Sequence, residues 1–171
     1  MDLKAKVFEI QNLVNSNKTK EALLKCEKLI KILPDNSYIH NLYGLILQKK
    51  GQISKSITCF KKSLEHDPNN FSAMNNLGNS YKNSYNYKKA EDLYIKIIKK
   101  NNKNIKVLNN YANLKKELNK YKEAKNLLLE AIKLEPNNVY ILSNIAACCE
   151  AIGEKNEAKE YALKILSLDP K

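Results

Sequence analysis

Asparagine is the side chain in this sequence whose type and spacing point most directly to a binding chemistry. The 171 residues include 24 asparagines, many of which recur at one fixed interval along the chain. The recurring sets are Asn41, Asn75 and Asn109, then Asn76, Asn110 and Asn144, then Asn79 and Asn113. Each amide offers one acceptor and two donors, so a row of amides can pair with an extended peptide backbone without reading its side chains. The spacing therefore predicts a peptide-binding surface.

Side chains that commonly carry catalysis are few and isolated. We interpret His40 as a partly packed residue and His66 as a residue near the C-terminal end of a helix, where partial positive charge is favourable. The four cysteines show no Cys-x-x-Cys spacing and are expected to be reduced, partly buried small hydrophobic residues: Cys26, Cys59, Cys148 and Cys149. The sequence shows no Gly-rich phosphate loop, Ser-His-Asp set or paired carboxylates. We expect no enzyme activity, metal or cofactor.

The elements that position these side chains repeat at the same interval as the asparagines. Prolines stand at Pro34, Pro68, Pro136 and Pro170, and Asn102 takes the missing place in the series. Proline ends a helix and a following asparagine caps the next one. We frame five units in a single domain: 3–36, 37–70, 71–104, 105–138 and 139–171. Apolar residues at helical spacing fill each unit on both sides of a central break, so each unit is a helical hairpin that must stack on its neighbours. The predicted breaks lie at Gly51, Tyr85-Asn86, Asn119 and Gly153.

The pattern within the units resembles the tetratricopeptide repeat, and the third unit fits it well. That unit carries the following motif residues: Met74, Leu77-Gly78, Tyr81, Ala90 and Tyr94. Small residues recur where the two helices of a hairpin cross, as in Gly44 opposite Ser56 and Ala112 opposite Ala124. The resemblance covers essentially the whole chain. It implies an all-α fold, a right-handed superhelical solenoid of five hairpins.

The resemblance also implies that one side of each first helix lines a concave groove. Counting from the first residue of each unit, slots 5, 6 and 9 lie opposite the core slots, and eight of these fifteen positions are Asn. The pattern is similar to repeats of the O-linked N-acetylglucosamine transferase type, whose Asn ladder holds peptides. That similarity reaches Asn76, Asn110 and Asn144, with the other five amides as flanking contacts. A solvated, compositionally enriched set of Asn is the competing interpretation.

A second binding mode of the family, a clamp for two carboxylates, fits this sequence poorly. Lys106 and Asn76 match two of its positions. The remaining positions hold Asn41, Leu45 and Asn110, so most of the required positive charge is absent.

The net charge of +12 raises the possibility of a polyanionic partner. All 30 basic residues are Lys, however, and none supplies the bidentate fork with which Arg grips phosphate. Composition therefore favours a solvated Lys-rich surface over a dedicated nucleic-acid site. An acidic partner would favour the third and fourth units, which carry cations on or near their first helices: Lys82, Lys106, Lys115 and Lys116.

The sequence as a whole predicts a module that binds an extended peptide or a partner helix. The principal alternative is the targeting part of a larger transferase enzyme, and a third is a polyanion binder. No apolar stretch resembles a signal peptide or a membrane span, so we expect a cytoplasmic protein. We also expect Leu163 and Leu166 on the last unit to pair with another copy or another segment.

Overall fold

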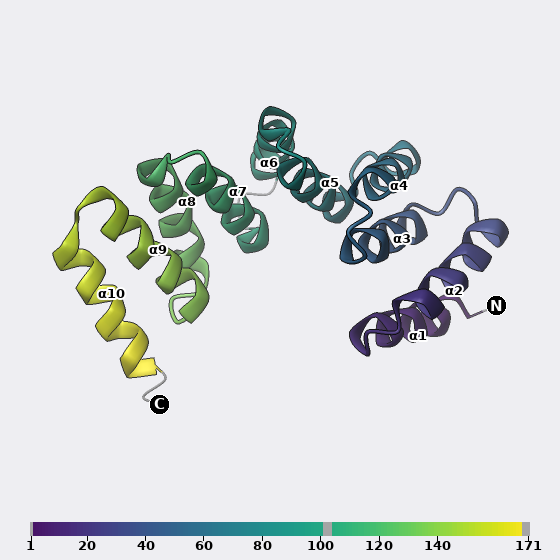
Figure 1. The fold of residues 1–171 in the computed structure, drawn as a ribbon, viewed down its shortest axis with the longest axis horizontal. Coiled ribbons are helices and arrows are strands. Elements are labelled where there is room, and N and C mark those ends of the chain that lie inside the picture. Colours follow the sequence, from purple (N-terminus) through teal and green to yellow (C-terminus); the bar gives the residue numbers. More distant parts are fainter. Residues whose placement is uncertain (1, 101–103, 169–171) are drawn as a thin grey trace. The chain divides into compact units, whose positions relative to one another are not determined.

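The described residues, 2–100 and 104–168 of a computed structural model, form ten helices and no strand. The first helices of the five hairpins are α1 (Leu3–Asn15), α3 (Ser37–Lys49), α5 (Phe71–Asn83), α7 (Ile105–Glu117) and α9 (Val139–Ile152). The second helices are α2 (Thr19–Ile32), α4 (Ile53–His66), α6 (Tyr87–Lys100), α8 (Tyr121–Leu134) and α10 (Lys155–Leu168) (Figure 1). The predicted all-α class with five helical hairpins is confirmed. Asn102 and Pro170 lie outside the described residues.

The chain divides into two compact units, Met1–Leu93 and Tyr94–Lys171. In the first unit consecutive helices from α1 to α5 pack on one another, and α3 also contacts α5. In the second unit the same order holds from α7 to α10. The assignment of all five repeats to a single domain stays a prediction.

Every first helix begins at a side-chain cap placed at the same point of the repeat. In four of them an asparagine side-chain oxygen accepts a hydrogen bond from the backbone N–H three residues later, over 3.0–3.2 Å. These caps are Asn36, Asn70, Asn104 and Asn138, and Asp2 caps α1 in the same way. A cap satisfies a backbone donor that the helix leaves without an intrahelical partner. Part of the high Asn content is therefore structural.

The turn inside each hairpin contains one residue with a positive φ, at an equivalent position in every repeat. Gly51 and Gly153 have φ of 74° and 83°, and Asn17, Tyr85 and Asn119 have φ of 62°, 59° and 57°. The predicted breaks at Gly51, Tyr85, Asn119 and Gly153 coincide with these turns. In the degenerate first repeat, the sequence interpretation missed the equivalent residue, Asn17.

Replacing Gly51 with alanine should lower the free energy of unfolding by about 1 kcal/mol, because the left-handed conformation disfavours a Cβ atom. No heavy atom lies within 4 Å of an added Cβ, so the cost isolates the backbone conformation. Gly51→Asn should cost less, since Asn tolerates this region. Denaturant unfolding measures both variants. An alanine variant as stable as the parent would contradict the turn geometry.

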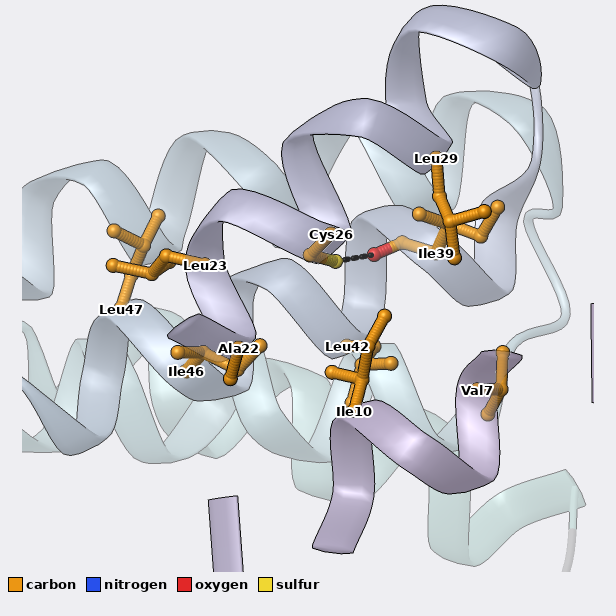
Figure 2. Packing of buried hydrophobic residues seen from close by; sticks show 10 residues of the cluster. All are labelled: Val7, Ile10, Ala22, Leu23, Cys26, Leu29, Ile39, Leu42, Ile46 and Leu47. Atoms are coloured by element: carbon orange, nitrogen blue, oxygen red, sulfur yellow. Dashed lines mark hydrogen bonds between the residues drawn. The ribbon is translucent and has the colours of Figure 1, made fainter. Parts of the chain in front are cut away.

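Each unit has its own apolar core between its stacked helices. In the first unit, side chains from α1, α2 and α3 meet, including Ile10, Ala22 and Ile39 (Figure 2). The Cys26 thiol lies in this core and donates to the backbone oxygen of Ile39 over 3.8 Å. In the second unit, Leu108, Leu128 and other buried side chains join α7, α8, α9 and α10. Neighbouring hairpins therefore share one core, which is the reason a single hairpin cannot bury its apolar face alone.

The predicted close crossing of the two helices within a hairpin is present at Gly44. A Cβ atom built on Gly44 would lie 2.6 Å from one carbon of the Phe60 ring, well inside van der Waals contact. Ser56, the predicted partner, is fully buried but bonds to the Ser80 hydroxyl over 3.2 Å. The Phe60 ring on α4 is thus the group that requires glycine at position 44 of α3.

Two surface properties of the helices bear on the expected partners. Among the described residues, no helix is long and apolar enough to cross a membrane. The side chains of Leu163 and Leu166 on α10 are more than half exposed. Self-association through this face of α10 stays a prediction.

Candidate binding surface on the first helices

The asparagines of slots 5 and 6 pair with each other between neighbouring repeats of the same unit. In the first unit the Asn76 amide donates to the Asn41 side-chain oxygen over 2.9 Å, which joins α5 to α3. Each of these two residues is 5% exposed. Because a buried amide is costly unless it is hydrogen-bonded, this pair specifies how the two first helices pack.

The same pairing recurs in the second unit, but at a more open position. The Asn144 amide on α9 donates to the Asn109 side-chain oxygen on α7 over 3.3 Å. The Lys116 ammonium donates to the Asn144 side-chain oxygen over 2.7 Å. Asn109, Asn144 and Lys116 are all partly exposed. This surface of α7 and α9 can therefore offer amide and ammonium groups to a ligand.

The remaining predicted site residues differ in exposure. Asn75 is buried beside Asn76, whereas Asn79, Asn110 and Asn113 are partly exposed. Asn75, Asn79 and Asn110 each have an interaction partner in the structure. The predicted set is thus a mixture of buried amides that hold helices together and partly exposed amides on the same helices.

Two residues that sequence reasoning did not single out extend this surface, Tyr140 and Tyr38. Hydrogen bonds from the side chains of Asn113, Asn144 and Asn109 lower the pKa of the Tyr140 phenol. The Tyr38 hydroxyl accepts a hydrogen bond from the Gln11 amide over 3.0 Å. Both tyrosines occupy the second slot of their repeats, three repeats apart, and this shared slot is the signal that could have identified them.

Beside α1 and the start of α3, the corresponding surface is mainly apolar. A pocket of about 440 Å³ lies between α1 and the start of α3, and it is lined by Leu3, Lys4, Val7, Phe8, Gln11, Asn36 and Tyr38. The Phe8 side chain in its wall is largely exposed. Leu42 is buried and Leu45 is exposed on the same face of α3. The first helices therefore present apolar groups in α1 and α3 and polar groups in α7 and α9.

One of the cations expected to attract an acidic partner is not accessible. Lys115 is 4% exposed, its ammonium lies 2.5 Å from a Glu123 carboxylate oxygen, and it also lies over the Tyr111 ring. A buried lysine requires such partners because its charge is desolvated. The neighbouring Lys116 is partly exposed, and Lys106 on the same helix is exposed.

The histidines and cysteines take structural positions. His40 is buried, its Nε2 atom lies 2.6 Å from the Pro34 carbonyl oxygen, and its ring stacks on that of His66 at 5.4 Å between centroids. His66 is the last residue of α4, as predicted. All four cysteines are free, and burial raises the pKa of the Cys26 thiol to about 12. Such thiols are poor nucleophiles near neutral pH.

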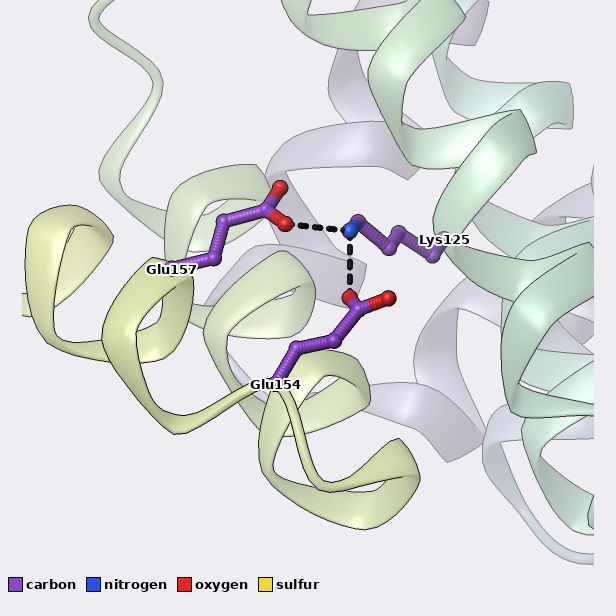
Figure 3. Close-up of polar contacts among 3 residues, drawn as sticks. All are labelled: Lys125, Glu154 and Glu157. Atoms are coloured by element: carbon purple, nitrogen blue, oxygen red, sulfur yellow. Dashed lines mark hydrogen bonds and ion pairs between the residues drawn. The ribbon is translucent and has the colours of Figure 1, made fainter.

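One group of potential metal ligands already contains a cation. The ligand atoms of Cys149, Glu154 and Glu157 all lie within 4.8 Å of one another. The Lys125 ammonium from α8 lies 2.6 Å from an oxygen of each glutamate, and its side chain is 12% exposed (Figure 3). Although burial opposes the charge, hydrogen bonds to Glu154 and Glu157 raise the pKa of Lys125. These contacts join the fourth repeat to the fifth.

Comparison with known proteins agrees with this architecture. The model of the Psidin N-terminal TPR repeats region matches residues 5–168. The chain belongs to this tetratricopeptide repeat family. The structure is also similar to a solved MamA structure from Desulfovibrio magneticus, with a TM-score of 0.83. The two are 16% identical, and the match covers 98% of this chain and 94% of that chain. The PilF structure from Pseudomonas aeruginosa gives a TM-score of 0.87 at 17% identity over 96% of this chain and 75% of that chain. At these identities the likeness shows the fold.

A curated relative shares a shorter stretch of tetratricopeptide sequence. The uncharacterized protein ycf37 of Pyropia yezoensis is 38% identical over 76 residues, which is 43% of each chain. The match thus spans less than half the length of that relative. The specific resemblance to repeats of the O-linked N-acetylglucosamine transferase type stays a hypothesis based on the asparagine pattern.

Proposed function

We propose that this chain is a protein-interaction module that binds an extended peptide segment along the first helices of its repeats. The observation that carries this proposal is the set of partly exposed amides on neighbouring first helices, at Asn109, Asn110, Asn113 and Asn144. Amides in this arrangement can donate to and accept from peptide groups of an extended chain. The two histidine rings, in contrast, stack on each other, and the Cys26 thiol bonds to the backbone oxygen of Ile39.

The buried amides have a different role in this proposal. Asn41 and Asn76 hold α3 against α5 and so fix the spacing of the surface that a peptide meets. Helices that are held in place before binding lower the conformational cost of binding. The apolar pocket beside Phe8 supplies contact area of another kind in the first unit.

Selection of a random peptide library against the immobilised chain tests this function. We expect enriched peptides that bind the chain and lose affinity when Asn110 and Asn144 are both replaced with alanine. Asn126 on α8 is exposed and lies outside this surface, so Asn126→Ala is the matched control. Enriched peptides that bind the Asn110→Ala/Asn144→Ala variant as tightly as the parent would overturn the proposed surface.

A further inference from the structure

One side of α10 is open where the same side of the other second helices is covered. In the first four repeats slot 24 is 0% exposed, and it holds Cys26, Phe60, Tyr94 and Leu128. The next first helix provides the cover, as where α3 packs on α2 and α9 packs on α8. In the fifth repeat slot 24 holds Ala162, which is exposed. Slot 28 is partly buried in the first four repeats, whereas Leu166 in this slot is 59% exposed.

The open side of α10 is a continuous stripe with a cationic and an apolar half. Its exposed residues recur at intervals of one, three and four, which places them on one side of the helix: Lys155, Lys159, Ala162, Leu163 and Leu166. The two leucines are 56% and 59% exposed. The N-terminal half of the stripe therefore carries two ammonium groups, and the C-terminal half carries the apolar side chains.

The α1 helix of a second copy is a poor cover for this stripe. In the other four first helices slots 3, 4 and 10 are at most 5% exposed. In α1 the same slots hold Ala5, Lys6 and Asn12, and all three side chains are exposed. A head-to-tail stack of α10 on α1 would bury the Lys6 ammonium and the Asn12 amide, and the desolvation of both groups opposes such a contact.

The α10 helix of a second copy matches the stripe when the two helices run antiparallel. A two-fold axis between Ala162 and Leu163 would place each Leu163 on Ala162 of the other copy. Each Leu166 would then cover the aliphatic stem of Lys159 of the other copy. The ammonium groups would lie near the last turn of the other α10, where the helix dipole is negative and no basic residue is present. A parallel pair would instead place lysine beside lysine.

We propose that α10 is a dimerisation helix, which pairs with α10 of a second copy in a two-fold antiparallel arrangement through Ala162, Leu163 and Leu166. This contact lies outside the first-helix surface and does not depend on peptide binding. One helix from each copy buries less area than a standard interface of about 1,600 Å², so the dimer should be weak and depend on concentration. Because both copies use the same face, association should stop at the dimer.

Sedimentation velocity of the full chain between about 5 and 500 μM tests the pairing. We expect a reversible equilibrium between monomer and dimer, with no larger species. Leu166→Lys places a cation beside Lys159 of the other copy at both symmetric contacts, so it should weaken dimerisation at least tenfold. Leu24 on α2 is also 59% exposed, and Leu24→Lys is therefore the matched control. It should change the dimerisation constant less than about twofold.

A charge exchange tests the antiparallel register. Lys159→Glu in the Leu166→Lys background restores opposite charges at both contacts, so it should recover about threefold to tenfold of the lost affinity. Lys133→Glu makes the same change of charge at an exposed position on α8 and should recover less than about twofold in that background. In a parallel pair residue 159 does not meet residue 166 of the other copy, and the two double variants should then behave alike.

Several results would overturn the α10 pair. These are a monomer throughout the concentration range, species larger than a dimer, or a dimer that Leu166→Lys leaves intact. Equal recovery by the two double variants would overturn the antiparallel register. Circular dichroism verifies that each variant keeps its helices, and Leu166 is exposed enough that its replacement should not unfold α10. Library peptides should bind Leu166→Lys as they bind the parent, so the dimer and the peptide surface are tested separately.

Discussion

Truncation of Phe60 to alanine is expected to lower the free energy of unfolding by about 3–5 kcal/mol. The Phe60 ring is 0% exposed and packs on the Gly44 backbone of the facing helix, so its loss removes buried apolar area and leaves a cavity. Neighbour interfaces spread stability along a repeat array. Hydrogen exchange should therefore show the largest loss of protection in α3 and α4, with smaller losses in the second unit.

The contact of Phe60 with Gly44 makes this expectation specific. Gly44→Ala alone should cost about 1–3 kcal/mol, because the new methyl group overlaps the ring. In the Phe60→Ala background the same methyl group enters the cavity, so Gly44→Ala should then be neutral or stabilising. Denaturant unfolding of the four proteins gives the coupling energy of the pair. Additive effects of the two changes would show that the helices do not cross as described.

The second large effect is expected on affinity, from replacement of Asn76, Asn110 and Asn144 with alanine. If each amide makes one net hydrogen bond, directly or by holding the surface in place, its loss costs about 0.5–1.5 kcal/mol. The triple variant should then bind a selected library peptide about one to three orders of magnitude more weakly. Isothermal titration calorimetry measures this change, with Asn126→Ala as the control.

The melting temperature of the same variant distinguishes the two interpretations of these asparagines. If these Asn side chains were only solvated, replacing them with alanine, a better helix former, would raise the melting temperature of the chain. Asn76→Ala instead removes the donor of the hydrogen bond to the buried Asn41 side-chain oxygen. The unpaired oxygen should lower the free energy of unfolding by about 1–3 kcal/mol. We therefore expect a lower melting temperature. Unchanged affinity together with a raised melting temperature would support the solvated interpretation.

Much of the fold could be predicted from the sequence because its signals repeat. The capping residues from Asn36 to Asn138 and the left-handed turn residues from Asn17 to Gly153 recur from repeat to repeat at one fixed interval, and each acts on its own local backbone. Small and apolar residues at fixed offsets add the packing of one hairpin on the next. Local conformation and period together determine the helices without knowledge of any distant contact.

The candidate site was less predictable because its properties depend on contacts between repeats. The period of the sequence predicts that Asn41 and Asn76 lie on the same side of their helices. It does not predict that they form the buried hydrogen-bonded pair that joins α3 and α5. It grouped Lys115 with Lys116, although only the structure shows that Lys115 is buried against Glu123. Tyr140 was not identified because the lowering of its phenol pKa depends on amides from two neighbouring repeats.

Partly exposed amides on the first helices are expected to contact the bound peptide. NMR observation of the Asn side-chain amides during titration with a selected library peptide tests it most directly. We expect saturable shifts for Asn110, Asn113 and Asn144, and none for the capping residues Asn70 and Asn138, whose side-chain oxygens already bond to the backbone. Shifts confined to the caps, or to Asn126 on the second helix of its hairpin, would show that the peptide does not bind through these amides.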